Sequence, residues 1–160
     1  MMNFNNITTL GESATVVKDR SSYGNNGVVN AATWTGNGKW NGGYSFNGTT
    51  SYIDVTSTNS LNITTGITME AWIKNIGSNT NSSYVVKIGD SVHRSYGLMT
   101  VGKPIFWLSP DGTQTNRRYR PSTIDLTSDL TNWHYIVGTF SAGSGTHIFV
   151  DGVLTDDTMV

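Results

Sequence analysis

Apolar and polar residues alternate in short runs along this chain, and Gly, Asn and Ser separate one run from the next. The run GITMEAWIK at 66–74 places an apolar side chain at every second position. Trp72 falls on the other face with Glu70, so its ring is expected at an edge or in a groove. A period of two is typical of a strand with one buried face. No run keeps the spacing of three and four residues that an amphipathic helix needs. The pattern predicts an all-β fold of many short strands.

The same alternation predicts further strands at SYIDV (51–55), YVVKIG (84–89), YGLMTVG (96–102), PIFWLS (104–109), NWHYIVGTF (132–140) and HIFVDGVLT (147–155). In the last run, Asp151 and Gly152 predict a type I′ hairpin turn, because both central residues of that turn need a positive φ. The stretch 113–132 contains Pro121 and many polar residues, and is predicted as an extended loop. Trp34, Trp40 and Trp133 are assigned to the core.

The composition supports this fold and excludes several classes of partner. The chain has 160 residues, the length of one domain, with 36% apolar and 13% charged residues and 18 glycines. A net charge of −1 without a broad basic patch argues against nucleic acid as a partner. No apolar run approaches the length of a membrane span, so no membrane insertion is expected. The absence of cysteine excludes disulfides and thiolate chemistry.

Three motifs carry a resemblance to a known family: DRSSYGNNG at 19–27, GGYSFNGTTSYIDV at 42–55 and LTNWHYIVGTFSAGSGTHIFVDGVL at 130–154. In this order they resemble the laminin G-like domains of the concanavalin A-like lectin/glucanase superfamily, over about residues 16 to 155. The resemblance implies a two-sheet antiparallel jelly-roll sandwich, which agrees with the strand pattern. We expect residues 1–160 to form a single domain of this type.

The resemblance also predicts how the chain could pair with a second copy. Members of the family usually continue for a few strands after the Asp-Gly hairpin, and the last of those strands pairs with the N-terminal strand. The sequence ends at Val160, so the domain is expected to lack its final strands. A strand at Met2–Asn6 would then face an unpaired edge, and strand exchange in a homodimer is one way to satisfy that edge.

The first motif also implies a structural calcium ion. In the resembling family this loop helps to bind calcium, and the matching positions here are Asp19, Asn25 and, through its carbonyl, Gly27. Carboxylate and amide oxygens suit calcium, whereas zinc prefers His or Cys. The alternative is that Asp19 accepts hydrogen bonds from the N–H groups of its own loop, as in an Asx-type turn, while glycines supply positive φ. Both interpretations remain open at this stage.

Carboxylate chemistry argues against an enzyme. Retaining glycosidases of the resembling superfamily carry a Glu-x-Asp-x-x-Glu signature, because alternate positions of a strand place both carboxyl groups on one face. This chain has only two glutamates, Glu12 and Glu70, and the positions two residues from Glu70 are Thr68 and Trp72. The histidines show no metal-ligand spacing. No catalytic residue is predicted.

Aromatic and basic residues instead suggest a binding face. A sugar stacks its apolar face on an aromatic ring and offers hydroxyl groups to polar side chains. Candidate ligand-binding residues are Trp107, Tyr84, Tyr96, Tyr119 and Arg117. An arginine would favour an acidic or sulfated sugar through paired hydrogen bonds.

The sequence therefore predicts a non-catalytic recognition module of a larger extracellular or cell-surface protein, which binds carbohydrate. The alternative is a protein–protein interaction or adhesion domain that binds no sugar. Fold alone does not decide between these functions.

Overall fold

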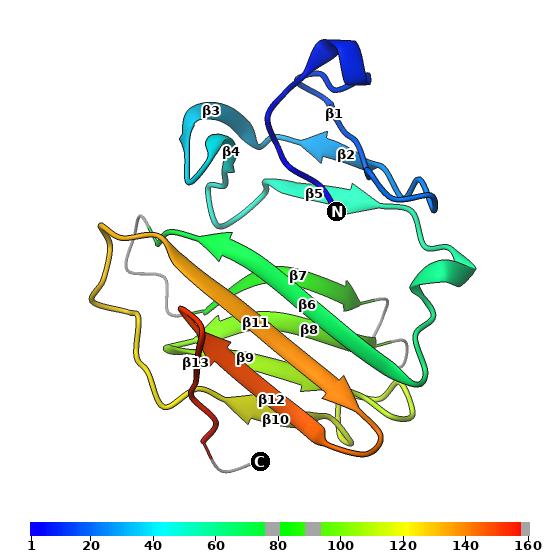
Figure 1. Cartoon of the computed structure of the whole chain (residues 1–160), viewed down its shortest axis with the longest axis vertical. Helices are drawn as coiled ribbons and strands as arrows, with labels where there is room; N and C mark the ends of the chain where they lie inside the picture. Colours follow the sequence, from blue (N-terminus) through cyan, green and yellow to red (C-terminus); the bar gives the residue numbers. More distant parts are fainter. Residues whose placement is uncertain (76–80, 89–93, 158–160) are drawn as a thin grey trace. The chain divides into compact units, whose positions relative to one another are not determined.

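The computed structural model describes residues 1–75, 81–88 and 94–157 (Figure 1). The chain divides into two compact units, Met1–Ile63 and Thr64–Val160, and each is described by itself. Antiparallel strands dominate both units. The prediction of a single domain over 1–160 remains a prediction.

The second unit is a sandwich of two four-stranded antiparallel sheets. The first sheet contains, in spatial order, β10 (Arg118–Pro121), β9 (Lys103–Leu108), β8 (Arg94–Val101) and β7 (Asn81–Ile88). The second contains β13 (Val153–Leu154), β12 (Gly145–Val150), β11 (His134–Ser141) and β6 (Gly66–Ile73). This arrangement confirms the predicted all-β, two-sheet antiparallel sandwich. Gly89, which ends the predicted run 84–89, lies outside the described residues.

Side chains from both sheets form one core in this unit. Leu98 and Phe106 of the first sheet and Ile136 and Ile148 of the second are fully buried in it. At Gly138 of β11 a Cβ atom would come within 2.4 Å of the Phe106 ring, so the missing side chain lets the ring approach the opposite sheet. The inward face of the first sheet is therefore the face of Phe106.

The opposite face of the first sheet positions the candidate site. Because side chains alternate along β9, Trp107 points away from the core that contains Phe106. Trp107 is paired with Gly97 of β8 on one side and with Tyr119 of β10 on the other. A Cβ atom on Gly97 would lie only 2.4 Å from the Trp107 Nε1, so the indole rests on the backbone of β8.

The first unit contains a small sheet, a hairpin and two short 3₁₀ helices. The three-stranded sheet has the order β1 (Val16–Val17), β2 (Gly27–Asn30) and β5 (Tyr52–Val55), and the hairpin joins β3 (Thr33–Gly38) to β4 (Asn41–Ser45). The 3₁₀ helices are η1 (Thr8–Leu10) and η2 (Asn59–Leu61). Val17 and Val29 are buried on one face of the sheet, whereas Val28 and Tyr52 are more than half exposed on the other.

The last hairpin agrees with its sequence signal. Asp151 and Gly152 have φ angles of 51° and 82°, as a type I′ turn requires, and they join β12 to β13. The prediction for 113–132 is wrong in part, because Arg118–Pro121 forms β10. Pro121 ends an edge strand, where the missing N–H breaks no ladder.

Two other predictions are wrong. Met2–Asn6 forms no strand, since Phe4 and Asn6 have positive φ angles of 57° and 55°. This segment packs within its unit instead: the Phe4 carbonyl accepts a hydrogen bond from the Trp34 indole at 2.9 Å. Trp34 and Trp40 are 37% and 67% exposed and do not belong to the core, while Trp133 is half-buried.

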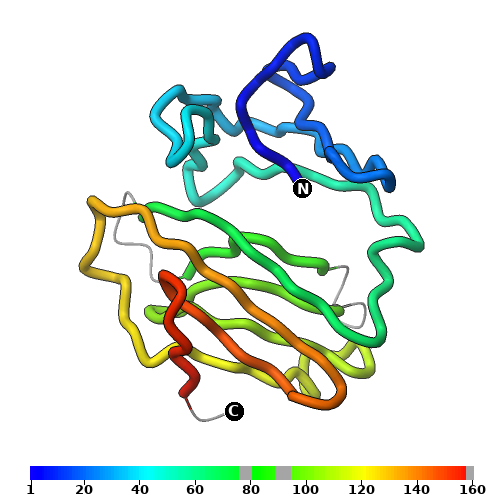
Figure 2. The backbone as a smooth tube through the Cα atoms, viewed as in Figure 1, coloured from blue at the N-terminus to red at the C-terminus, as the bar shows by residue number. Residues whose placement is uncertain are grey.

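Residues 155–157 link the edges of the two sheets, and Figure 2 follows their path after β13. Thr155 donates its N–H to the carbonyl of Ile148 in β12, at 3.0 Å. The Thr155 carbonyl accepts the N–H of Thr123, and Asp157 donates to the Pro121 carbonyl at the end of β10. The chain thus holds both layers together along one side of the sandwich.

Candidate functional site

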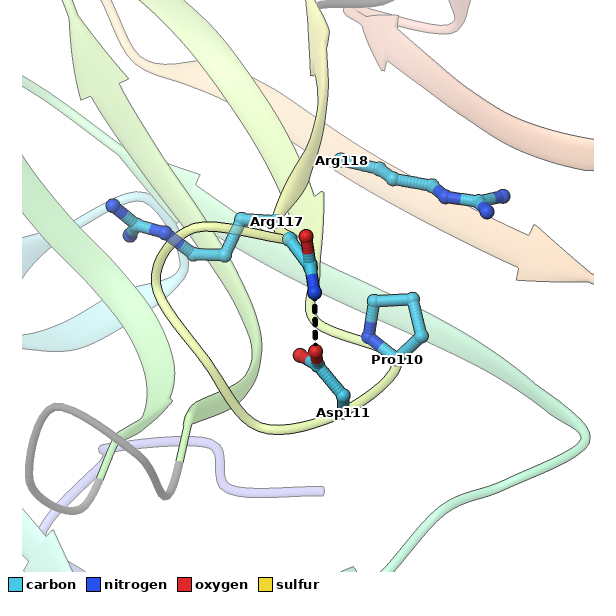
Figure 3. Close-up of a pocket in the computed structure, with 5 residues that line it drawn as sticks. Pro110, Asp111, Arg117 and Arg118 are labelled. Atoms are coloured by element: carbon cyan, nitrogen blue, oxygen red, sulfur yellow. Dashed lines mark hydrogen bonds between the residues drawn. The ribbon is translucent and has the colours of Figure 1, made fainter.

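The loop between β9 and β10 is organised by one carboxylate, that of Asp111. Its Oδ1 accepts hydrogen bonds from the N–H and the hydroxyl of Thr113, at 2.9 and 2.8 Å, and from the Ser109 hydroxyl at 3.3 Å. Its Oδ2 accepts from the side-chain amide of Asn116 (Figure 3). The hydrogen bonds from Asn116 and then Thr113 lower the pKa of Asp111 to about 2. The carboxylate is charged at neutral pH and fixes the loop.

Arg117 follows this loop and lies against two aromatic rings. Its guanidinium carbon is 5.1 Å from the centre of the Trp107 ring and 5.0 Å from that of Tyr119. The Nε of Arg117 also donates to the Gln114 carbonyl at 3.4 Å. Cation–π contacts with two rings restrict the guanidinium, so it loses less freedom when it binds a ligand.

A hollow of about 420 Å³ opens beside this arginine. Its lining residues are Pro110, Asp111, Asn116, Arg117 and Arg118. The side chains of Arg117 and Arg118 project in opposite directions in Figure 3, as neighbouring residues of an extended chain do. The lining residues therefore include hydrogen-bond donors, acceptors and both signs of charge, with the two guanidinium groups on opposite sides, and the apolar ring of Pro110.

The structure brings together three of the five predicted ligand-binding residues, Trp107, Tyr119 and Arg117. Trp107 is 0% exposed, so the expectation that its ring meets a sugar is corrected: the indole supports Arg117 instead. Tyr96 is buried in the core and Tyr84 packs against it, on the inward side of the sheet. Burial raises the pKa of both tyrosines. Neither lies with the other three.

Sequence reasoning missed Asp111 and Asn116. A signal existed in the run Ser-Pro-Asp-Gly-Thr at 109–113, because Asp followed two positions later by Thr is typical of an Asx turn. No such local sequence pattern predicts the hydrogen bond from Asn116 to Asp111. The five-residue separation becomes a contact only because the loop folds back toward β10.

Asp19 organises a second loop, in the first unit. Its Oδ1 accepts hydrogen bonds from the Met1 ammonium and the Ser21 N–H, at 2.8 and 2.9 Å. Its Oδ2 accepts from the Ser21 hydroxyl at 2.6 Å and from the Asn25 N–H at 3.0 Å. Desolvation raises the pKa of Asp19, but the hydrogen bonds from the ammonium and from Ser21 outweigh it and hold the pKa well below its usual range.

These contacts bear on the predicted calcium site. The Asn25 side-chain oxygen accepts from the Thr58 hydroxyl at 2.9 Å, and Gly27 is a buried ladder residue between β1 and β5. Since four donors already surround the Asp19 carboxylate, its lone pairs face N–H and O–H groups rather than a cation. This arrangement fits the Asx-type turn better than it fits calcium, and calcium at Asp19, Asn25 and Gly27 stays a prediction.

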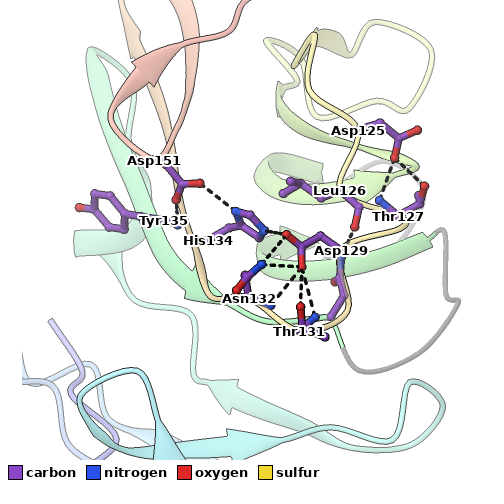
Figure 4. A network of polar contacts seen from close by, with 10 residues as sticks. Asp125, Leu126, Thr127, Asp129, Thr131, Asn132, His134, Tyr135 and Asp151 are labelled. Carbon is purple, nitrogen blue, oxygen red and sulfur yellow. Dashed lines mark hydrogen bonds and ion pairs between the residues drawn. The ribbon is translucent and has the colours of Figure 1, made fainter.

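The loop before β11 holds another polar network (Figure 4). Asp129 accepts hydrogen bonds from Thr131 and Asn132, and the His134 ring contacts the carboxylates of Asp129 and Asp151 at 3.1 and 2.8 Å. The hydrogen bonds from Asn132 and Thr131 hold the pKa of Asp129 well below its usual range. The network ties this loop to the last hairpin.

Glu70 is exposed and accepts a hydrogen bond from the Tyr135 hydroxyl, which raises the pKa of that tyrosine. Trp72 stacks on Tyr135, with ring centres 5.1 Å apart, and is 37% exposed. In the described ranges, no group of three or more His, Cys, Asp or Glu side chains could hold a metal ion. The same ranges contain no helix of the length and apolarity that a membrane crossing requires.

Comparison with protein families gives one match. A laminin G model, described as the concanavalin A-like lectin/glucanases superfamily, matches residues 47–160. The matched part contains the whole second unit and the β9–β10 loop, whereas Asp19 and Asn25 lie outside it. Comparisons with curated proteins and with solved structures gave no significant match.

Laminin G-like domains are generally non-catalytic and serve recognition. The matched residues form most of the chain, and the two-sheet antiparallel sandwich is the fold that this family has. The chain belongs to the concanavalin A-like lectin/glucanases superfamily, as a member of its laminin G-like branch.

Proposed function

We propose that this chain is a non-catalytic, carbohydrate-binding module of an extracellular or cell-surface protein, and that it binds an acidic or sulfated sugar at the β9–β10 loop. The observation that carries the proposal is the position of Arg117. Its guanidinium lies over the neighbouring rings of Trp107 and Tyr119, and Arg117 lines a polar hollow. A fixed guanidinium binds carboxylate or sulfate oxygens through paired N–H donors.

The rest of the hollow suits the remainder of a sugar ring. The Asp111 carboxylate already accepts four hydrogen bonds from its own loop, so the Asn116 amide, which can both donate and accept, is the partner for hydroxyl groups of the sugar. Pro110 supplies an apolar surface for the C–H groups of the ring. A volume of about 420 Å³ has the size of a small ligand site. These features support a short oligosaccharide over a larger folded partner at this position.

Calorimetric titration with a sulfated or uronate oligosaccharide, and with its neutral counterpart, tests the proposal. We expect binding of the charged sugar, and a roughly 10- to 100-fold weaker Kd in Arg117→Ala, because hydrogen bonds to charged groups contribute about 1.5–3 kcal/mol. Arg20→Ala is the matched control, since it removes the same charge from an exposed position in the first unit. Equal affinity of both variants, or no binding by the wild type, would contradict the proposal.

A second candidate function, protein recognition without sugar, is supported by β7. This strand ends its sheet and exposes Val85, Val86 and Ile88, which are 44%, 36% and 41% accessible. An edge strand with apolar side chains can accept a strand from another protein. Binding to an immobilised matrix protein that resists excess sugar and is lost in Val86→Lys would favour this function. Analytical ultracentrifugation of the wild type and of Val86→Lys, which gives the mass of each in solution, tests whether the chain forms a homodimer by strand exchange.

A further inference from the structure

The His134 ring lies between two carboxylates that belong to different parts of the second unit. Its Nδ1 is 2.8 Å from the Asp151 Oδ2, and its Nε2 is 3.1 Å from the Asp129 Oδ2 (Figure 4). Asp129 belongs to the loop before β11, whereas Asp151 belongs to the turn between β12 and β13. The β6 residue paired with His134 is Ile73, which does not titrate. The ring therefore joins the loop to the last hairpin through both of its nitrogens.

Other donors fix the two carboxylates in these positions. Asp129 accepts hydrogen bonds from the backbone N–H groups of Thr131 and Asn132, at 3.2 and 3.0 Å. The hydrogen bonds from Asn132 and Thr131 hold the pKa of Asp129 well below its usual range, so this carboxylate stays charged in mild acid. The Asp151 Oδ1 accepts the N–H of Tyr135 at 2.8 Å. Neither carboxylate can turn away from His134 without breaking these bonds.

This geometry selects one protonation state of the ring. A charged carboxylate only accepts hydrogen bonds, and a neutral imidazole has one N–H donor and one lone pair. A neutral His134 would therefore direct its lone pair at one of the two carboxylates. The doubly protonated ring donates to both and places a positive charge between them. The His134 side chain is only 12% exposed, so water has little room to relieve the conflict of the neutral ring.

His147 has a weaker form of the same arrangement. Its Nδ1 is 2.7 Å from the Asp156 Oδ2, and its Nε2 is 3.0 Å from the Ser144 carbonyl oxygen. A neutral His147 can still donate to Asp156 and loses only the bond to the carbonyl. The Nε of Arg120 lies 4.0 Å from the same Asp156 oxygen and supplies positive charge there. A change of pH should therefore affect the contacts of His147 less than those of His134.

We propose that His134, Asp129 and Asp151 form a proton-dependent latch. The latch holds the loop before β11 against the last hairpin while the ring is doubly protonated, and it opens as the pH rises through the range in which histidine titrates. The folded chain offers the protonated ring two carboxylates that the unfolded chain does not hold in place, so protonation stabilises the folded state. The latch is closed in mild acid and loses one charge-assisted hydrogen bond when the ring becomes neutral. The hairpin leads directly into residues 155–157, so the latch acts where the two layers are joined.

Thermal unfolding of the full chain at about pH 5.5 and about pH 8.5 tests the latch. Asp151→Asn is the decisive variant, because Asn followed by Gly also suits a type I′ turn and the amide oxygen can still accept the Tyr135 N–H. The introduced amide N–H would donate to the lone pair of a neutral ring, which removes the need for the second proton. We expect the lower pH to raise the Tm of the wild type by roughly 3–6 °C more than that of Asp151→Asn.

Controls separate the latch from other groups that titrate in this range. The Met1 ammonium, which contacts Asp19, and His147 are present in both proteins, so they cancel in the comparison. His147→Gln should keep most of the wild-type pH dependence. If Asp151→Asn does not fold by circular dichroism, Asp129→Asn replaces it, because its amide would face the other ring nitrogen.

Nitrogen NMR of the imidazole gives a second, direct measurement. We expect the spectrum of the wild type at about pH 6 to show both His134 nitrogens protonated. A neutral His134 ring at that pH, or equal pH dependence of Tm in the wild type and in the Asn variant, would overturn the proposal. Sugar titration at both pH values reports on the proposed function separately, since Arg117 follows a different loop.

Discussion

Two loops of this protein use the same local device with different consequences. Asp19 and Asp111 each accept four hydrogen bonds. Three come from shared positions: the N–H and the hydroxyl of the residue two positions ahead, and an asparagine further on. The fourth comes from the Met1 ammonium at Asp19 and from the Ser109 hydroxyl at Asp111. The Asp19 side chain is only 8% exposed, and its loop runs into the buried ladder residue Gly27. The Asp111 loop is exposed and runs into Arg117.

The difference between the two loops shows that the aspartate orders its loop, whereas the residues around the loop determine which groups are available to a ligand. After Asp19 the chain enters β2 at Gly27, which has no side chain. The donors that follow Asp19 in this loop bond to the aspartate itself. After Asp111 a long cationic side chain leaves the loop and meets two rings on the outward face of a sheet. The groups proposed to bind a ligand at the second loop therefore come from the residues that follow the turn.

The largest expected effect comes from adding one methyl group beneath each loop. A Cβ on Gly97 would lie 2.4 Å from the Trp107 Nε1, and a Cβ on Gly27 would lie 2.5 Å from the Ile53 Cγ2. Overpacking of this kind costs about 1–3 kcal/mol, so urea denaturation should show both Gly97→Ala and Gly27→Ala to be destabilised. Only Gly97→Ala should also weaken sugar binding, because it displaces the indole under Arg117. Equal sugar affinity of the two variants would break the comparison.

The two aspartates provide the next test. Asp111→Ala removes the contacts to Thr113 and Asn116 that set the start of β10, and we expect roughly tenfold weaker sugar binding in calorimetry, about the value of one hydrogen bond to a charged group. Asp19→Ala should leave the sugar affinity unchanged. A loss of affinity in the Asp19 variant would mean that the loops are not independent.

A smaller effect is expected when one of the two rings under Arg117 is removed. Tyr119→Leu keeps an apolar but shorter side chain and removes the ring beside Arg117. An exposed cation–π contact contributes about 0.5–1 kcal/mol, so the Kd should rise roughly two- to fivefold. The same change at Tyr52, which is 56% exposed in the first unit, is the control. An unchanged Kd in Tyr119→Leu would show that Trp107 alone holds the arginine.

The smallest effect is a pH dependence. The pKa of Asp111 is about 2, below its ordinary value of 3.8, so the ordering that its carboxylate provides is complete above about pH 4 and is lost as the pH falls through 2. Binding of a sulfated sugar, which keeps its charge, should therefore persist at pH 3. In Asp111→Asn the affinity should be lower and nearly independent of pH in this range. A loss of wild-type binding near pH 4, with circular dichroism unchanged, would contradict the role of Asp111.

The sequence predicted what local chemistry determines. Alternation identified the long strands, and the positive φ angles that Asp151 and Gly152 tolerate identified the last hairpin. It missed β10, because Arg118–Pro121 is polar, ends in proline and pairs only along one edge. β10 pairs only with β9, the strand before it, and the intervening loop that sets this pairing leaves no periodic signal.

Burial of the tryptophans could not be predicted for the same reason. Trp107 alternates with Phe106 and points away from the core, yet it is fully buried where Gly97 and Arg117 lie against it. Trp34 belongs to the β3–β4 hairpin. Its indole N–H donates to the Phe4 carbonyl, and its ring stays partly exposed. The alternation along a strand predicts which face of the sheet a ring lies on. It does not predict which residues from other parts of the chain cover that face.

The segment 155–157 determines how this module would carry mechanical load. Its backbone bonds run to Ile148 in one layer and to Pro121 and Thr123 beside the other, so tension applied after Asp157 would act on both layers at the same time. Hydrogen bonds that are strained together resist a pull better than bonds that open one after another, and the rate of forced unfolding depends on that resistance. A tether attached there is therefore expected to load hydrogen bonds of both layers together, whereas a terminal strand paired with one neighbour would load one layer.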